Sequence, residues 1–262
     1  MIEQIILGTI QGITEWLPIS SEGVLVLIKT NFFAEQGLEE TIKQVLFLHF
    51  GTFLAAFVYF RKDVWSLIKT LFNYKSASLE TKKIFKFLII VTLISGILGF
   101  VLLKIFIGLE SELLLSSKIL TLIIGFLLIF TGVLQLKAIN KGNKNICNLN
   151  NKDSILLGLM QGLAVLPGLS RSGLTVSALL LRKFNSQDAL KLSFLMSLPI
   201  VLGGNIILNL KYFTFSIELF WGLVFSFIFG LLTINLLLHL AKKINFGYFV
   251  LIFGLLVIIG CL

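Results

Sequence analysis

The chain of 262 residues is 57% apolar and only 13% charged, and its mean hydropathy is +1.00. This balance excludes an ordinary soluble domain, and several apolar runs reach the ~20 residues that cross a bilayer. The basic residues behind the net charge of +9 lie in loops between apolar runs. They therefore indicate topology determinants that face anionic lipid, and no nucleic-acid partner is expected. We predict an all-α polytopic membrane protein.

The first apolar segment, 2–28, is broken in its middle by Pro18, Gly23 and two serines. Residues 154–181 are broken in the same way. Each segment predicts a helix–break–helix hairpin that enters the membrane and returns on the same side. Irregular backbone at that depth must be buried in protein or line a polar cavity. The start of the chain, Met1-Ile2-Glu3, lacks the basic region of a cleavable signal peptide.

The remaining apolar runs predict about six membrane-spanning helices, the last of which is short. They are 43–60, 84–107, 115–136, 190–210, 217–239 and 246–262. If both hairpins return to their own side, one face carries 16 of the 22 Lys and Arg residues, in 61–86, 137–153, 182–191 and 241–245. The positive-inside rule makes that face cytoplasmic. Both termini are then expected outside a multi-pass protein of the plasma membrane.

The two hairpins carry one sequence pattern. LGTIQGITEWLPISSEG at 7–23 aligns with LGLMQGLAVLPGLSRSG at 157–173, at an offset of 150 residues. This duplication predicts two repeats, about 1–136 and about 150–262, within a single membrane domain. Since the first hairpin enters from outside and the second from the cytoplasm, we expect an inverted repeat whose hairpin tips meet near the membrane middle.

Small residues recur at matching places in both hairpins. Gly8 and Gly12 correspond to Gly158 and Gly162. Glycines four residues apart let two helices approach closely. We therefore expect these glycines where the two hairpins cross.

Arg171 is the most informative residue of the second hairpin. An unpaired guanidinium in hydrocarbon costs about 2.5–3.5 kcal/mol on insertion scales, so one interpretation is a purely structural ion pair with Glu15 or Glu22. An anion site is favoured instead, because hydroxyl and backbone N–H donors before a helix start receive phosphate and Arg adds a planar bidentate fork. The candidate substrate-binding donors around it are Ser170, Ser172, Gly173 and Thr175.

Two carboxylates and two serines stand at the tip of the first hairpin. Glu15 and Glu22 bracket Leu-Pro-Ile-Ser-Ser, and a buried carboxylate near a cation acts as a general base, a metal ligand or half of an ion pair. Ser20 and Ser21 are either helix N-caps or part of a phosphoryl-transfer site. In that site a serine is the nucleophile, a carboxylate activates it, and Arg171 stabilises charge on the phosphoryl oxygens.

Other polar residues of the apolar segments carry weaker signals. Gln11 and Gln161, at matching positions, are expected to hydrogen-bond across the hairpin crossing. His49 lies within a predicted span and is a candidate for lining the cavity. No glycine-rich nucleotide loop or metal-binding histidine cluster is present in the sequence.

The two motifs together resemble the BacA/UppP family of undecaprenyl-diphosphate phosphatases. QGITEWLPISSEG at 11–23, FLHFGTFLAAFVYFR at 47–61, LPGLSRSGLT at 166–175 and SFLMSLPIVLGG at 193–204 follow the family's order over nearly the whole chain. The resemblance implies a membrane enzyme with two re-entrant hairpins in an inverted repeat. It would remove the terminal phosphate of a polyprenyl diphosphate and so recycle the lipid carrier of cell-wall or surface-glycan synthesis. It also implies a divalent cation, Mg²⁺ or Ca²⁺, and a link to bacitracin resistance.

The resemblance also assigns roles to residues. Ser21 would be the nucleophile, Glu15 its base or a metal partner together with Glu22, and Arg171 the third catalytic residue. The substrate would contact Ser20, Glu22, Ser170, Ser172, Gly173, Thr175 and Gln11. The matching residues are Gly12, Thr14, Glu15, Leu17, Pro18, Ser20, Ser21 and Gly23 in the first motif, and Pro167, Gly168, Ser170, Arg171, Ser172, Gly173 and Thr175 in the second.

Three positions depart from the family pattern. Gln11 stands where the family has a glutamate, Val24 stands where it has a histidine, and Glu22 replaces a small or hydroxyl residue. The first two changes remove candidate proton carriers or metal contacts, for which Glu22 or His49 could substitute.

Three function classes follow from the sequence. The first is a polyprenyl-diphosphate phosphatase that works among membrane lipids. The second is a polyprenyl-phosphate transporter that uses the inverted repeat for alternating access without hydrolysis. It is favoured by the missing glutamate and histidine and disfavoured by the retained serine pair. A purely structural membrane protein fits poorly with an arginine and two glutamates inside re-entrant segments. The sequence is compatible with a homo-oligomer.

Overall fold

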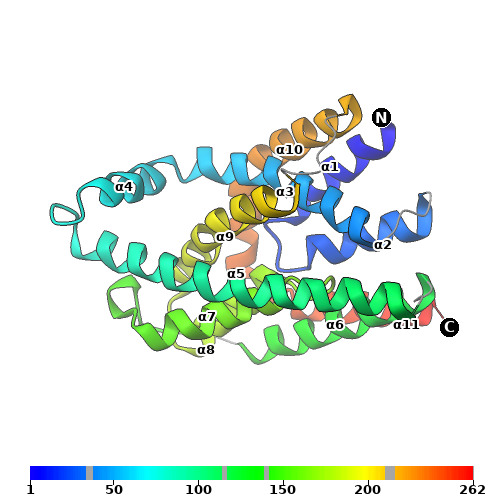
Figure 1. The fold of residues 1–262 in the computed structure, drawn as a ribbon. Helices are drawn as coiled ribbons and strands as arrows, with labels where there is room; N and C mark the ends of the chain where they lie inside the picture. The colour runs from blue at the N-terminus through cyan, green and yellow to red at the C-terminus, as the bar shows by residue number, and fades with distance from the viewer. Residues whose placement is uncertain (34–37, 114–116, 139–141, 210–215, 262) are drawn as a thin grey trace.

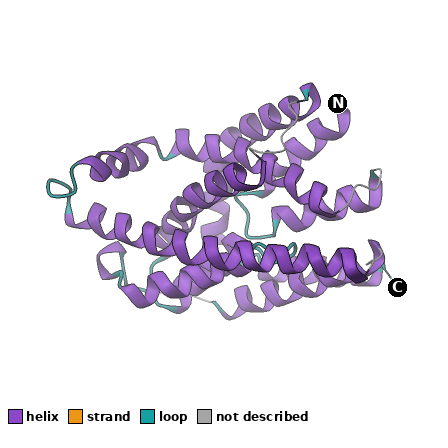
Figure 2. Cartoon of the chain, in the orientation of Figure 1, coloured by secondary structure: helices purple, strands orange, loops and turns teal. Residues whose placement is uncertain are grey.

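The computed structural model describes residues 1–33, 38–113, 117–138, 142–209 and 216–261. This part of the chain is helical and contains no named strand (Figure 2). The helices are α1 (Ile2–Thr14), α2 (Ser21–Phe32), α3 (Leu38–Tyr59), α4 (Arg61–Phe72), α5 (Leu79–Leu113), α6 (Ser117–Lys137), α7 (Asn151–Leu163), α8 (Arg171–Leu181), α9 (Ser186–Asn209), α10 (Ile217–Lys243) and α11 (Gly247–Ile259), with a short 3₁₀ helix at Ile146–Asn148. The predicted fold class, an all-α polytopic membrane protein, is confirmed.

Five helices of the described part are long and apolar enough to cross a bilayer, namely α3, α5, α6, α9 and α10. They coincide with the first five predicted spans. The sixth predicted span, 246–262, contains α11, which is apolar but has only 13 residues. At 1.5 Å per residue such a helix is shorter than the hydrocarbon core, so the prediction of six full spans is wrong for this one. The predicted loop 61–86 also contains a helix, α4, which was not predicted.

Both chain ends lie at one end of the helix bundle, and α4 lies at the other (Figure 1). This agrees with the prediction that the termini share one face and the basic segment 61–86 belongs to the opposite face. The two predicted hairpins are present as α1–α2 and α7–α8.

Each hairpin packs against a spanning helix from the other half of the chain. Helix α1 lies along α10, whereas α7 lies along α5, and α6 pairs with α11 between the halves (Figure 1). Helix α1 of the first half thus packs on a helix of the second half, and α7 of the second half packs on a helix of the first. Two repeats at 1–136 and 150–262 would produce this reciprocal packing. The repeat boundaries themselves stay a prediction.

The paired glycines lie at these helix contacts and not at a hairpin crossing, so that expectation is wrong. A Cβ atom on Gly8 would lie 2.1 Å from the carbonyl oxygen of Gly222 in α10. In the second hairpin, a Cβ on Gly162 would lie 2.9 Å from the Leu98 side chain in α5. The small residues do allow close approach, as expected, but their partners are spanning helices, which sequence spacing cannot identify.

Replacing Gly8 with alanine should destabilise the protein, because the new methyl group would collide with backbone that has no room to move. Overpacking of this kind costs about 1–3 kcal/mol, and we expect a lower midpoint of thermal unfolding in detergent. The matched control is Gly108→Ala in α5, where a Cβ meets nothing within 4 Å and the better helix propensity of alanine should be neutral or stabilising. Equal unfolding midpoints for the two variants would contradict the close α1–α10 contact.

Candidate active site at the hairpin tips

Each hairpin turns at an irregular segment in the middle of the bundle, residues 15–20 in the first and 164–170 in the second (Figure 2). The helix that follows starts at a serine N-cap. Ser20 Oγ accepts a hydrogen bond from the Gly23 N–H at 3.3 Å, and Ser170 Oγ accepts one from the Gly173 N–H at 3.0 Å. The N-cap interpretation is confirmed for Ser20. Ser21 therefore occupies the first position of α2, as Arg171 does in α8.

The backbone at both tips adopts left-handed conformations. Ser20 has φ 64°, which is uncommon for a residue with a side chain and is typical of functional sites held by their surroundings. Gly168 has φ 102°, and a Cβ there would lie 2.7 Å from the Ile124 carbonyl oxygen of α6. Glycine is therefore required at this turn both by its conformation and by the close approach of α6.

The two tips contact each other, as the inverted arrangement predicts. Ser172 Oγ donates to the Leu17 carbonyl oxygen at 3.2 Å. Gln135 of α6 supports the same stretch of backbone, since its Nε2 donates to the Pro18 carbonyl oxygen at 2.6 Å. Trp16 anchors the first tip to the spanning helices: its ring packs edge-on against Phe194 at 5.5 Å, and its Nε1–H donates to α10.

Glu15 is the centre of the polar cluster at the tips. Its Oε1 pairs with Arg171 Nη2. Its Oε2 accepts from Ser21 Oγ at 2.8 Å and from Gln11 Nε2 at 3.0 Å, and His49 Nε2 lies 3.3 Å away. The residue is only 6% exposed, so these partners replace the water that a carboxylate otherwise needs. The predicted convergence of Ser21, Glu15 and Arg171 is therefore present in the structure.

Arg171 is held on several sides. Its Nη1 donates to the Ser193 carbonyl oxygen of α9 at 3.1 Å, and its guanidinium lies over the Phe194 ring at 5.7 Å. Thr175 Oγ1 donates to the Arg171 carbonyl oxygen at 2.8 Å and contacts Ser193 Oγ at 2.7 Å. Among the described residues, one hydrogen bond from Nη1 and one from Nη2 reach protein acceptors, so the other N–H groups of the guanidinium are available to an anion.

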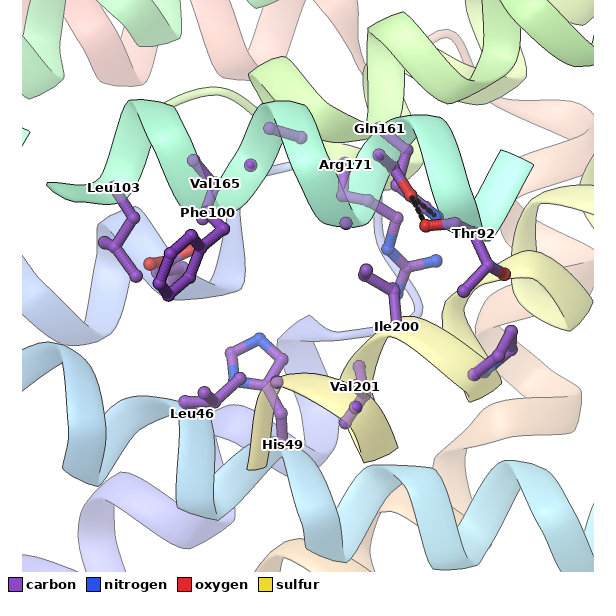
Figure 3. Close-up of a pocket in the computed structure, with 18 of the residues that line it drawn as sticks. Leu46, His49, Thr92, Phe100, Leu103, Gln161, Val165, Arg171, Ile200 and Val201 are labelled. Atoms are coloured by element: carbon purple, nitrogen blue, oxygen red, sulfur yellow. Dashed lines mark hydrogen bonds between the residues drawn. The ribbon is translucent and has the colours of Figure 1, made fainter. Parts of the chain in front are cut away.

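A cavity of about 570 Å³ opens beside this cluster. Figure 3 shows Arg171, Gln161 and Thr92 along one wall, with His49, Leu46 and Val201 across from them. The polar residues that line it are Glu15, Ser20, Ser21, Glu22, His49, Thr92, Ser95, Gln161, Ser170, Arg171 and Ser172. The rest of the lining is apolar and comes mainly from α3, α5 and α9. The hypothesis that His49 lines a cavity is confirmed.

Three predicted substrate contacts do not line the cavity. Gly173 and Thr175 lie behind it, where Thr175 supports Arg171. Gln11 is fully buried and donates to Glu15 and, at 3.4 Å, to Thr52 Oγ1. It therefore orients the carboxylate and has no path to a substrate. Gln11 and Thr175 each lie one helical turn away from the site residue that they contact, Glu15 and Arg171. They share its helix face but support it from behind, a depth that motif spacing does not give.

The cavity also contains polar residues that were not predicted to line it. Gln161 Nε2 donates to Ser95 Oγ of α5 at 3.0 Å and to the Met196 carbonyl oxygen of α9 at 3.3 Å. The expected hydrogen bond between Gln161 and Gln11 across a hairpin crossing is therefore wrong. One sequence feature could have indicated these lining residues: two hydroxyl residues, Thr92 and Ser95, lie three positions apart on one face of an apolar span.

One carboxylate of the site, that of Glu22, is placed to bind a divalent cation. Glu15 has both oxygens engaged, whereas Glu22 lines the cavity and forms no hydrogen bond or ion pair with any described residue. The described residues contain no cluster of three or more His, Cys, Asp or Glu side chains that could hold a metal ion. Mg²⁺ commonly binds one or two carboxylates together with substrate phosphates, so Glu22 satisfies what the protein must provide.

Comparison with known proteins agrees with this arrangement. The chain matches the family described as bacitracin resistance protein BacA over residues 4–259. The chain belongs to this family. A relative from Methanococcoides burtonii, named undecaprenyl-diphosphatase, is 44% identical over 97% of this chain and 96% of its own length. Relatives of the same name from Methanothrix thermoacetophila and Haloarcula marismortui are 35% and 34% identical, over 97% and 98% of this chain and 94% and 95% of their own lengths.

Membership of the BacA family covers both hairpins and all five long spans, so the site lies within the shared region. The family resemblance inferred from the two motifs is thereby confirmed.

Proposed function

We propose that the protein hydrolyses the terminal phosphate of a polyprenyl diphosphate, of the undecaprenyl type, to give the lipid monophosphate and inorganic phosphate. The observation that carries the proposal is the hydrogen bond from Ser21 Oγ to Glu15, with Arg171 on the other carboxylate oxygen. A nucleophile, its base and a cation for the phosphoryl oxygens then meet in one buried cluster. The names of the relatives point to the same substrate.

In the first chemical step, Ser21 Oγ attacks the terminal phosphorus and its proton passes to Glu15 Oε2, 2.8 Å away. The bond from phosphorus to the bridging oxygen breaks, and the lipid monophosphate leaves with that electron pair. Arg171 shares its guanidinium between Glu15 and the phosphoryl oxygens, where charge develops. Water then hydrolyses the phosphoserine, and Glu15 returns its proton to Ser21 Oγ.

The apolar part of the cavity suits the polyprenyl chain. It is lined by the first half of α3 and the later parts of α5 and α9, at Leu46, Phe100, Leu103 and Leu208. These segments lie toward the end of the bundle that carries both termini (Figure 1). Since the basic loops mark the other face as cytoplasmic, the site takes its substrate from the outer leaflet. The cellular location that follows is the plasma membrane, and the role is recycling of the lipid carrier for surface glycans.

A divalent cation, Mg²⁺ or Ca²⁺, would be held by Glu22 together with the diphosphate oxygens. When bound, it neutralises phosphate charge and favours departure of the lipid monophosphate. Glu15 serves as the base and remains with Ser21 and Arg171.

The proposal is tested by phosphate release from undecaprenyl diphosphate by the purified protein, with Mg²⁺, with Ca²⁺ and with EDTA. We expect cation-dependent release, and we expect Glu22→Gln to require a higher cation concentration for half-maximal rate. If the folded protein binds the lipid but releases no phosphate, the phosphatase proposal is refuted and the polyprenyl-phosphate transporter is favoured.

A further inference from the structure

Two buried oxygen atoms in the cavity wall have no hydrogen-bond partner among the residues that the structure describes. Across the described residues, four buried side-chain polar atoms are unpartnered: Gln4 Oε1, Gln11 Oε1, Thr92 Oγ1 and Gln161 Oε1. Only Thr92 and Gln161 line the cavity. An unpaired buried polar group costs about 1–3 kcal/mol, so two such atoms on one wall indicate a ligand.

The orientation of the Gln161 side chain is determined by its amide nitrogen. Nε2 donates to Ser95 Oγ and to the Met196 carbonyl oxygen. The Met196 carbonyl oxygen can only accept a hydrogen bond. If the Gln161 amide were flipped, its Oε1 would therefore face this carbonyl oxygen and repel it. Oε1 is therefore held as an acceptor in the wall, on a side chain that is 5% exposed. Thr92 lies near Gln161 in the cavity wall (Figure 3). Ser95, three residues further along the same face of α5, accepts the hydrogen bond from Gln161 Nε2.

The ligand must donate a hydrogen bond to Gln161 Oε1. Phosphate oxygens without protons are acceptors and would be repelled there. Two neutral oxygens without a carboxylate are also a poor set for a divalent cation. Water donates twice and accepts twice, and it needs two to four polar partners in a cavity. The neighbouring wall residues Leu93, Ile97 and Ile200 are apolar, so water in this part of the cavity depends on Thr92, Ser95 and Gln161.

We propose that Thr92, Ser95 and Gln161 form the binding site for the water molecule that hydrolyses the phosphorylated enzyme. The inference rests on the proposed function, because it takes Ser21 as the phosphorylated residue. The water oxygen bonds to phosphorus while the bond from phosphorus to Ser21 Oγ breaks. Glu15 returns its proton to Ser21 Oγ, and the proton of the water passes to a phosphoryl oxygen of the departing phosphate. A glutamine that orients attacking water has the same task in GTP hydrolysis.

Thr92→Val and Gln161→Met test this assignment. Thr92→Val removes a hydroxyl that has no partner within the described structure, so the fold should lose no hydrogen bond. In rapid-quench experiments with undecaprenyl diphosphate labelled in the terminal phosphate, the double variant should form lipid monophosphate once, at close to the wild-type rate. Steady-state phosphate release should fall about 100-fold, the effect of a misplaced reactant, and labelled Ser21 should accumulate.

Matched controls separate this role from packing. Thr92→Ser, with Gln161 unchanged, keeps a hydroxyl at this position and should release phosphate like the wild-type protein. Gln4→Met removes another buried glutamine whose Oε1 is unpartnered, outside the cavity lining, and should leave both steps unchanged. Phosphate release at the wild-type rate in the double variant would overturn the inference, and so would an equal loss of both steps without labelled enzyme. Failure of the wild-type protein to release phosphate would instead refute the proposed function.

Discussion

Replacing Ser21 with alanine should reduce phosphate release by at least about 10⁴-fold, the scale seen when a catalytic nucleophile is removed. Its Oγ lies 2.8 Å from Glu15 in a buried cluster, and nothing else in the cavity combines a hydroxyl with a hydrogen bond to a carboxylate among the described residues. The anion-binding groups around Arg171 stay in place. Binding of undecaprenyl diphosphate, measured by tryptophan fluorescence in detergent, should therefore change little.

Ser197→Ala provides the matched control. Ser197 is also buried and donates to the Phe194 carbonyl oxygen at 2.7 Å, but it does not line the cavity. We expect this variant to keep most of its activity. If Ser21→Ala still released phosphate at a tenth of the wild-type rate, water would have to attack the diphosphate directly and Ser21 would only help to orient Glu15.

The second large effect concerns the ion pair between Glu15 and Arg171. Arg171→Met leaves the buried Glu15 without its guanidinium partner, and breaking a buried pair costs about 3–5 kcal/mol. Glu15→Gln leaves the opposite charge unpaired and should destabilise the protein similarly. The double variant removes both charges, so its free energy of unfolding should recover most of the loss. This cycle can be measured by denaturant titration in mixed micelles.

Activity separates a structural ion pair from a functional one. All three variants should lose phosphate release, because the base and the group that stabilises the phosphoryl charge are absent whether or not the fold is restored. A double variant that is both stable and active would show that the pair serves the fold alone. Gln has the shape of Glu, and Met is an unbranched residue with a volume close to that of Arg, which limits cavity effects in the comparison.

Local features of the sequence were sufficient for several predictions. Membrane spans depend on the length and composition of single segments, so five of six were correct. Hairpin breaks and helix starts depend on a few adjacent residues, which is why the N-cap Ser20 was predictable. Ser21, the second N-cap candidate, is instead the first residue of α2. The prediction of a full span at 246–262 was wrong because it also used composition alone. In an apolar run, composition does not distinguish the 13 residues of α11 from the residues that flank them.

The duplicated motif also predicted which groups would meet. An inverted repeat brings two hairpin tips together, and the duplication is therefore sufficient to place Ser21 and Glu15 near Arg171. The repeat did not indicate the neighbours of either hairpin. The assignment of Gly8 to a hairpin crossing was wrong because α10, from the other half of the chain, occupies that face.

The sequence alone therefore determined the class of protein, the position of the hairpins and the chemical groups at their tips, since each follows from a short stretch of chain or from the duplication. The tertiary structure decided that Gln11 and His49 join Glu15, that Thr175 supports Arg171 from behind, and that Thr92 and Gln161 face the cavity. These contacts join residues on different helices. They depend on helix rotation and packing, which a period of 3.6 residues leaves open until the partner helices are known.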